Sequence, residues 1–572
     1  MIYFLQSLKF TVERSYLLLM QVSALCVLFI SVYKQILLIE PRVIDNGLVL
    51  SQSVIYESAS PMYAYFYSAF NLETVFVAIA LKIGYGQELI SLFALFVPLA
   101  LLYFGISNFL IAINPKFVAL AVIIPLFTIF SVDRTFAINE YPLNYVSVHS
   151  FGVFGIAVAT YFIGLMAKKS FFLIGLFIPL LPAVHPVVGI FTLLFIFFIV
   201  FIFGASKENF HLGGIRFFIN KKMICGIVVG ILIVVTSFTI IYLNLPKPTN
   251  LKINHQAVES YNLYWDYHRN VHGLSFNYIK YQLILIALAF TLIILEKREC
   301  WPLRFYIYLS TGLLLAYSCK DYYPQILVDI LFIRMPLIIA PMSAALFIYL
   351  KVIVLVRIIL YFSRKVVSKN NKNIRWRTEN FKWLFIKTIK YNKQIIIIVY
   401  IGILLLIQKN SMALFFGAIK DQYFTVTTYN SLNVIQKKES LPLLNGSLKS
   451  SLVVTTLSTS RWAMLKLYSP ILLDLSGFDF ISYLPNTAGS ISNIIIEIYG
   501  IDFNNPPESI RNTGVIADQD IKNIFTNRSA NDWNSLANKY LFNAVIVPSD
   551  WVLNIEKKTV IDGVAIYSLY KI

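Results

Sequence analysis

The chain has 572 residues, of which 58% are hydrophobic and 13% are charged. Its mean hydropathy of +0.71 indicates more apolar surface than one soluble core needs, which excludes a soluble globular protein and predicts a polytopic membrane protein. The formal net charge is +19 at pH 7, but the basic residues lie in short loops between apolar runs. Membrane topology explains such a distribution better than a nucleic-acid-binding face, so no nucleic acid partner is expected.

The apolar runs predict the membrane spans in chain order. Residues 15–33 form a run that is too long for a cleaved signal peptide and has no small-x-small site at its end, so it is expected to remain as an anchor. With the length needed to cross roughly 30 Å of hydrocarbon as the guide, about eleven spans are predicted, at 15–33, 89–113, 115–131, 148–167, 170–183, 186–204, 223–243, 281–295, 304–319, 335–361 and 395–416.

Residues 62–83 are apolar enough to insert but carry Glu73 near their middle, where an ionised group is expensive. We interpret this segment as a re-entrant or surface-lying pair of short helices. With that choice the basic loops, of which 363–393 is the most strongly charged, all fall on the side of the N-terminus, and the excess of Lys and Arg predicts that this side is cytoplasmic.

The same parity places residues 34–88, 132–147, 244–280 and 320–334 outside, together with the tail from about residue 417. The abundance of Lys, Asn and Ile indicates an AT-rich bacterium, and the expected location is therefore the bacterial inner membrane. Under this prediction the chain crosses the membrane many times and ends in an extracytoplasmic tail.

The tail changes character sharply, which divides the chain into a membrane domain at 1–416 and a second domain at 417–572. Strand-like runs at 451–457, 470–477, 543–549 and 564–572, with a helix-like stretch at 531–542, predict a small α/β domain. Its composition is that of a soluble domain, so it is expected to fold as a separate unit.

Three stretches carry a resemblance to a known group of enzymes. They are "EPRVIDNGLVLSQSVIYESASP" with the short helices after it, then "GYGQELISLFALFVPLALLYFGISNFLIAI" continuing into "NPKFVALAVIIPLFTIFSVDRTFAINEYPLNYVSVHSFG", and finally "NAVIVPSDW" with "VAIYSLYKI". This order resembles the GT-C superfamily of membrane glycosyltransferases, which use polyprenyl-phosphate-linked sugars. The resemblance implies an acidic residue in each of two outer loops and a small outer α/β domain at the end of the chain.

The resemblance implies that Asp45 is the base that deprotonates the acceptor hydroxyl, although Asn46 follows it where an Asp-Glu pair is usual. The alternative is that "DNG" is simply a turn, which its composition favours. In the second outer loop, Asp133 and Glu140 are the candidates for the second carboxylate. Arg134 is a candidate substrate-binding residue there, or it pairs with Asp133 or with lipid headgroups.

Further candidate substrate-binding residues are His185, His268, Arg269 and Arg334. His185 lies in a Pro-His-Pro break between two apolar runs and is either a hydrogen-bonded corner residue or a donor that faces a ligand. Arg269 and Arg334 are cations that could contact a lipid phosphate. The aromatic residues at 261, 264, 265 and 267 predict either stacking on sugar rings or anchoring at the membrane interface.

No cofactor is expected. The stretch "ADQD" (residues 517–520) contains a D-x-D pattern, for which helix capping is the simpler reading and a divalent metal site the alternative. The four cysteines have no CxxC spacing and predict neither a disulfide nor a zinc site. The sequence contains no P-loop, so ATP-driven transport by this chain is not expected.

Taken together, the sequence predicts a membrane glycosyltransferase that transfers a sugar from an undecaprenyl-phosphate-type donor to a cell-envelope glycan or lipid acceptor. An O-antigen polymerase or ligase, a polysaccharide transporter or flippase, and a non-catalytic assembly protein remain as alternatives. A transporter should carry charged residues deep within its spans, whereas most charges here lie in loops.

The topology is testable by labelling single cysteines from outside the cell. A cysteine placed at Ser450 should react with an impermeant maleimide, and one at Asn371 should react only after the membrane is permeabilised, because the basic loop that contains it is expected to be cytoplasmic. Labelling in the opposite pattern would invert the topology and remove Asp45 from the outer side.

Overall fold

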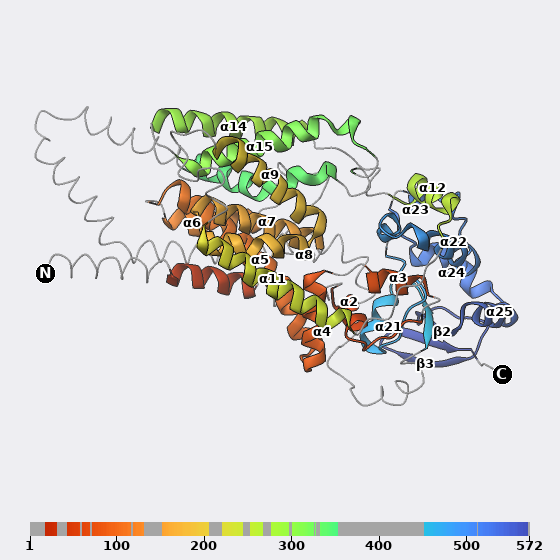
Figure 1. The fold of residues 1–572 in the computed structure, drawn as a ribbon. Helices are drawn as coiled ribbons and strands as arrows, with labels where there is room; N and C mark the ends of the chain where they lie inside the picture. Colours follow the sequence, from red (N-terminus) through yellow and green to blue (C-terminus); the bar gives the residue numbers. More distant parts are fainter. Residues whose placement is uncertain are drawn as a thin grey trace, which may run out of the picture.

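The computed structural model describes residues 18–30, 43–57, 60–68, 71–115, 118–130, 151–204, 220–243, 252–266, 276–296, 300–324, 327, 332–352, 451–476, 478–511 and 513–569. The apolar helices form a bundle, and the C-terminal α/β part lies beyond one end of it (Figure 1). Residues 451–569 are called the tail below.

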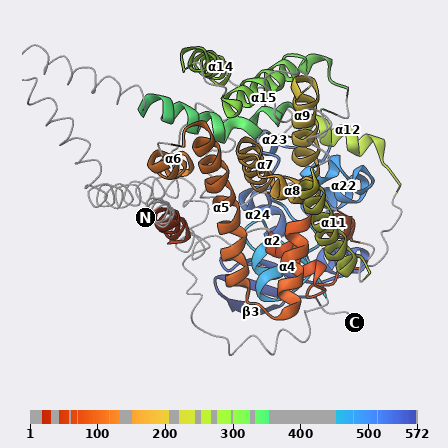
Figure 2. The same ribbon diagram turned by 60° about the vertical axis from the view of Figure 1, so that its left-hand side comes forward.

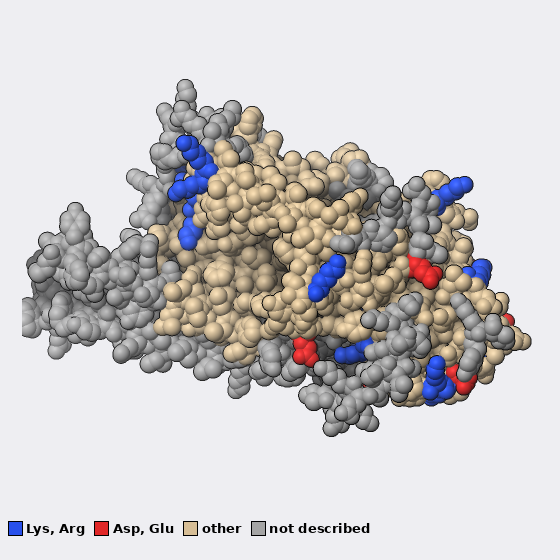
Figure 3. All heavy atoms as spheres, turned by 60° about the horizontal axis from the view of Figure 1, so that its bottom comes forward, with Lys and Arg blue, Asp and Glu red and all other residues tan. Residues whose placement is uncertain are grey.

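Five helices among the described residues are long and apolar enough to cross a membrane: α5 (Gln87–Ile113), α7 (Phe151–Lys168), α11 (Lys221–Tyr242), residues Asn277–Ile294 of α14 (Phe276–Glu296) and the helical stretch Arg334–Val352, which begins in η3 (Phe332–Ile339). These helices and the composition identify an integral membrane protein. On one face of the molecule, the surface of the bundle carries few charged side chains (Figure 3).

The predicted number of about eleven spans is not confirmed. Several predicted spans are helices of fewer than eighteen apolar residues, namely Leu18–Ile30, α6 (Val118–Phe130), α8 (Phe171–Val184) and Pro186–Phe201 within α9 (Pro186–Gly204). The predicted span at 304–319 corresponds to α15 (Trp301–Ser318). The predicted span at 395–416 lies outside the described residues.

Glycines set how closely α11 approaches α8. A Cβ atom on Gly226 would lie 2.1 Å from the carbonyl oxygen of Phe172, and one on Gly230 would lie 2.5 Å from that of Leu176. Real Cβ atoms do not come this close to backbone, so only glycine permits this packing. Most of the remaining surface of α11 is exposed, since only 22% of its apolar window is buried inside the protein.

Residues 61–83 form the expected pair of short helices. Helix α3 (Pro61–Ser68) and helix α4 (Leu72–Ile83) meet at a bend, and the helix axes of Pro61–Tyr67 and Leu72–Ile83 differ by 96°. Asn71 begins α4, because its side chain accepts a hydrogen bond from the Thr74 amide at 3.0 Å. Glu73 therefore lies in the first turn of α4, where the helix dipole favours a negative charge.

The tail contains one sheet covered by helices. The strands β1 (Leu452–Thr455), β2 (Phe542–Pro548), β3 (Lys557–Ile561) and β4 (Val564–Ser568) lie in the order β1-β2-β4-β3. Strand β1 is parallel to β2, and the other two pairings are antiparallel. The helices are α21 (Ser460–Lys466), α22 (Ala488–Glu497), α23 (Glu508–Arg511), α24 (Asp518–Asn527) and α25 (Ala530–Tyr540), with short 3-10 turns at Asp479–Ser482 and Pro485–Thr487.

The expected α/β tail is thus present, with two differences in its strands. The run at 470–477 was expected to be a strand, but among its described residues, 470–476, the sheet pairing is an isolated bridge from Ile471 to Val453. Further along the same run, Asp474 accepts a hydrogen bond from the Ser476 amide at 3.0 Å, which forms a local turn. Strand β3 was not expected, since its largely exposed residues give no apolar pattern.

A single apolar core joins the tail to short helices of the helical part. It includes Val43, Leu48 and Val49 of α2 (Val43–Leu50) together with tail residues such as Val453 and Ile546. Ring centroids of Tyr65 and Phe480 are 4.6 Å apart across this boundary. The division of the chain at residue 416 stays a prediction, because residues 353–450 lie outside the described part.

Helix α12 (His255–Tyr264) attaches a second polar segment to the tail. The indole nitrogen of Trp265 donates a hydrogen bond to the Phe503 carbonyl at 2.8 Å, and the two rings are stacked with centroids 5.0 Å apart. Ser260 donates to Asn504 at 2.6 Å. Trp265 and Tyr261 are therefore buried against the tail, and neither expectation for them, sugar stacking or membrane anchoring, is correct. Two views place α12 and the α2–α4 segment against different parts of the tail (Figures 1 and 2).

Trp265→Ala should weaken the attachment of α12 to the tail. Removing a fully buried aromatic side chain costs about 3–5 kcal/mol, so the detergent-solubilised chain should melt at a clearly lower temperature. Leu263→Ala is the matched control, because Leu263 lies two residues away and is 60% exposed. Equal melting temperatures for the two variants would contradict the docking role of Trp265.

Candidate functional site

Asp45 lies in helix α2 and not in a turn. The alternative reading of "DNG" as a turn is wrong, because Val43–Leu50 is helical throughout and all of it is buried. Gly47 serves close packing here, since a Cβ atom on it would lie 2.3 Å from a methyl group of Val77 in α4. Helix α2 is thus pressed against α4, which fixes the backbone that carries Asp45.

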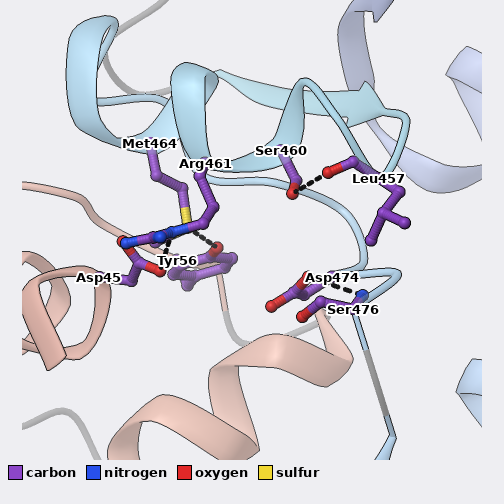
Figure 4. A network of polar contacts seen from close by, with 8 residues as sticks. All are labelled: Asp45, Tyr56, Leu457, Ser460, Arg461, Met464, Asp474 and Ser476. Atoms are coloured by element: carbon purple, nitrogen blue, oxygen red, sulfur yellow. Dashed lines mark hydrogen bonds and ion pairs between the residues drawn. The ribbon is translucent and has the colours of Figure 1, made fainter. Parts of the chain in front are cut away.

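The Asp45 carboxylate faces an arginine of the tail (Figure 4). The Nε–H group of Arg461 donates to Oδ2 of Asp45 at 3.3 Å, and the two side chains are 26% and 11% exposed. Arg461 is the second residue of α21 and is separated from Asp45 by 416 positions in the sequence. The ion pair therefore joins α2 to the tail at the end of the helical bundle.

The loop that leads from β1 into α21 is held by side-chain hydrogen bonds. The Thr459 hydroxyl accepts from the Thr456 amide at 3.0 Å and donates to the Ile546 carbonyl of β2 at 2.8 Å. Asp518, at the start of α24, accepts hydrogen bonds from the amide and the hydroxyl of Ser458. These contacts fix the start of α21 relative to the sheet, and with it the backbone of Arg461.

Tyr56 is a second polar link between the first segment and the tail. Its hydroxyl accepts a hydrogen bond from the Ile471 amide at 3.1 Å and lies 3.9 Å from the sulfur of Met464. Burial raises the pKa of the Tyr56 hydroxyl well above its ordinary value; the hydrogen bond from Ile471 opposes this, and the nearby charges of Asp474 and Asp45 add to it. Tyr56 is therefore neutral at physiological pH and links the two parts as a hydrogen-bonding group.

The other predicted site residues are only partly described. Asp133, Arg134 and Glu140 of the second predicted outer loop, and His268 and Arg269, lie outside the described residues. Arg334 is half-buried in η3, at the start of a membrane-capable stretch. The roles proposed for these residues stay predictions.

His185 lies at the break between α8 and α9. Its Nδ1 atom accepts a hydrogen bond from the Val188 amide at 3.3 Å. A Cβ atom on Gly155 of α7 would lie 2.9 Å from the Cβ of His185, so the histidine packs closely on that helix. These contacts are those of a corner residue, which was one of the two readings of His185; whether it also faces a ligand stays a prediction.

The D-x-D residues have structural partners. Asp520 caps α24 by accepting from the Ala517 amide at 2.9 Å, which confirms the capping interpretation, while Asp518 holds the loop at Ser458. Within the described ranges, no three His, Cys, Asp or Glu side chains gather as a metal site would require.

Sequence reasoning missed Arg461. Its immediate sequence, "STSRWAML" (residues 458–465), shows only the start of a short helix in the tail. The one signal available was that a buried carboxylate such as Asp45 needs a cationic or hydrogen-bonding partner, but nothing in the sequence says which arginine supplies it.

No protein-family model matches the chain, and no curated protein matches it. Among solved structures, the oligosaccharyltransferase of Archaeoglobus fulgidus in complex with Zn and sulfate is similar over 93% of this chain and 68% of that chain, with 11% sequence identity and a TM-score of 0.37. A likeness at this TM-score does not establish a common fold.

Tyr56→Phe should destabilise the contact between the first segment and the tail. The substitution keeps the ring but leaves the buried Ile471 amide without its acceptor, at a cost of about 1–3 kcal/mol. Thermal unfolding of the solubilised chain is the measurement. Tyr85→Phe serves as the control, because Tyr85 is 54% exposed, and this variant should unfold at the same temperature as the parent protein. If Tyr56→Phe is as stable as this control, the hydrogen bond to Ile471 is dispensable.

Proposed function

We propose that the chain is a membrane glycosyltransferase of the GT-C type that transfers a sugar from a polyprenyl-phosphate-linked donor to a cell-envelope glycan or lipid acceptor. The observation that carries this proposal is the position of Asp45. It is a mostly buried carboxylate beside Arg461, at the end of an apolar helical bundle and under an α/β domain. A lipid-anchored substrate reaches such a position from the membrane, and a polar acceptor reaches it from the water.

The proposed reaction needs a base and stabilisation of the leaving phosphate. Asp45 takes the proton of the acceptor hydroxyl, whose oxygen forms a bond to the anomeric carbon of the donor sugar. The bond from that carbon to the phosphate oxygen breaks, and the electron pair leaves with the lipid phosphate. Arg134, His268, Arg269 and Arg334 are the proposed donors of positive charge or hydrogen bonds to the phosphate, and Asp133 or Glu140 is the proposed second carboxylate.

The distribution of charge favours an enzyme over a transporter. In the five membrane-capable helices, charged residues lie near the helix ends; they are Glu88, Lys168, Lys221, Lys222, Lys280, Glu296, Arg334 and Lys351. A polar substrate that crosses the bilayer needs polar groups along its path, and ionisable residues within spans mark such paths. This observation concerns the described helices and supports a reaction at the end of the bundle.

Profiling of lipid-linked glycans in a strain that lacks the gene tests the proposed function. A transferase predicts that an acceptor lacking one sugar accumulates, and mass spectrometry of the extracted lipids would identify that sugar. A transporter predicts instead that a complete glycan accumulates on the cytoplasmic side. Loss of polymer length with unchanged repeat units would indicate a polymerase or ligase.

Asp45→Asn should strongly reduce product formation when it replaces the parent protein in that strain. Asparagine keeps the size of the side chain and removes the base, and general-base catalysis typically contributes about a hundred- to ten-thousandfold. The measurement is the rate at which the extended glycan appears after induction, at equal amounts of protein in the membrane.

Glu140→Gln is the companion variant. If it abolishes the product while Asp45→Asn does not, the base belongs to the second predicted loop. If neither substitution changes the rate, the proposed mechanism fails.

A further inference from the structure

The tail is attached to the helical part by contacts that do not involve Arg461. Trp265 inserts between Phe503 and Phe478, with ring centroids 5.0 and 5.5 Å away. Tyr65 packs on Phe480 at another point of the boundary. Burial of large aromatic side chains dominates the energetics of such interfaces, whereas in a largely buried ion pair, here with side chains 26% and 11% exposed, the cost of desolvation offsets much of the attraction. The Asp45–Arg461 contact is therefore not needed to hold the two parts together.

The contact instead determines where the carboxylate points. Asp45 is carried by α2, whose backbone is pressed on α4 at Gly47. Arg461 is carried by α21, whose start is hydrogen-bonded to β2 through Thr459. Since both backbones are fixed, the 3.3 Å contact between Nε and Oδ2 restricts the rotation of the Asp45 side chain. A base works only when it is aligned with the proton that it removes, and a misplacement of about 1 Å can reduce a rate on the order of a hundredfold.

We propose that Arg461 is a positioning residue for the Asp45 carboxylate, so that the C-terminal domain completes the reactive site of the membrane domain. This inference rests on the proposed function, in which Asp45 is the base. It assigns the tail a direct part in the reaction, in addition to any role in binding an acceptor.

The positive charge of Arg461 is the property to be tested. Arg461→Met keeps much of the length and apolar stem of the side chain but removes the cation, and Arg461→Lys keeps the cation without the guanidinium group. Arg511→Met is the matched control. Arg511 also lies on the tail, at the boundary with α12, where its guanidinium is 4.8 Å from the Tyr264 ring centroid, and it does not contact Asp45.

Docking is measured separately in the same variants. In a full-length chain whose four cysteines are replaced by serine, Ser260→Cys and Asn504→Cys report the contact between α12 and the tail, since the two native side chains lie 2.6 Å apart. A short bifunctional maleimide links the pair in membranes. After cleavage at a protease site inserted between α12 and the tail, the linked fragments stay together on a denaturing gel.

Each variant is expressed in the deletion strain, and the rate of appearance of the extended lipid-linked glycan is measured beside Asp45→Asn. Arg461→Met should lower the rate on the order of a hundredfold, Arg461→Lys should recover a substantial part of it, and Arg511→Met should equal the parent. All of these chains should crosslink normally. Rescue by lysine with intact docking is a result that a purely structural role of Arg461 would not give.

Other outcomes overturn the inference in distinguishable ways. A normal rate for Arg461→Met beside an inactive Asp45→Asn would remove Arg461 from the site and leave the proposed function intact. Loss of both crosslinking and product in Arg461→Met would reduce its role to docking, and equal defects in the Met and Lys variants would show that the charge does not matter. A normal rate for Asp45→Asn would overturn the base and the positioning residue together.

Discussion

The apolar layer between the tail and two segments of the helical part, α2–α4 and residues 252–266, is the contact on which the arrangement of the junction depends. Asp45 and Arg461 have no local reason to meet, because they belong to elements at opposite ends of the chain. Burial of side chains such as Tyr56, Trp265 and Phe480 brings those elements together, since removing apolar area from water is the main favourable term in such contacts. Apolar packing thus holds the backbones of α2 and α21 in place, and Asp45 and Arg461 form their contact between them.

This order of causes explains why a mostly buried carboxylate is tolerable at the junction. An ionised carboxylate that leaves water must find compensating partners, and Arg461 supplies one of them. The arginine can do so at little entropic expense because the loop before α21 is already held by Thr459 and Asp518. Because the backbone that carries Arg461 is fixed, the ion pair gives the Asp45 side chain a defined geometry rather than adding much to the stability of the protein.

Much of the architecture could be predicted from local patterns, whereas the pairing at the junction could not. The length of the apolar runs predicted α5, α7 and α11. Glu73 within another apolar run indicated that this run is broken into two helices, because the cost of placing a charge in lipid depends only on the local sequence. The aromatic residues near Trp265 were misread because burial in a protein core and anchoring at a membrane surface select the same side chains. Arg461 was missed because a contact across 416 positions leaves no trace in the spacing of residues.

The glycine contacts between α8 and α11 have a consequence for how the chain tolerates change. Helix α11 is attached along a narrow backbone stripe, and most of the rest of its surface is exposed. Its lipid-facing positions are thus interchangeable among apolar residues, whereas even one methyl group at Gly226 would wedge the two backbones apart. Ile241, near the end of α11, belongs to the apolar core that the tail shares with α2. A substitution at Gly226, within the helical bundle, would in this way disturb the packing of the tail without contacting it.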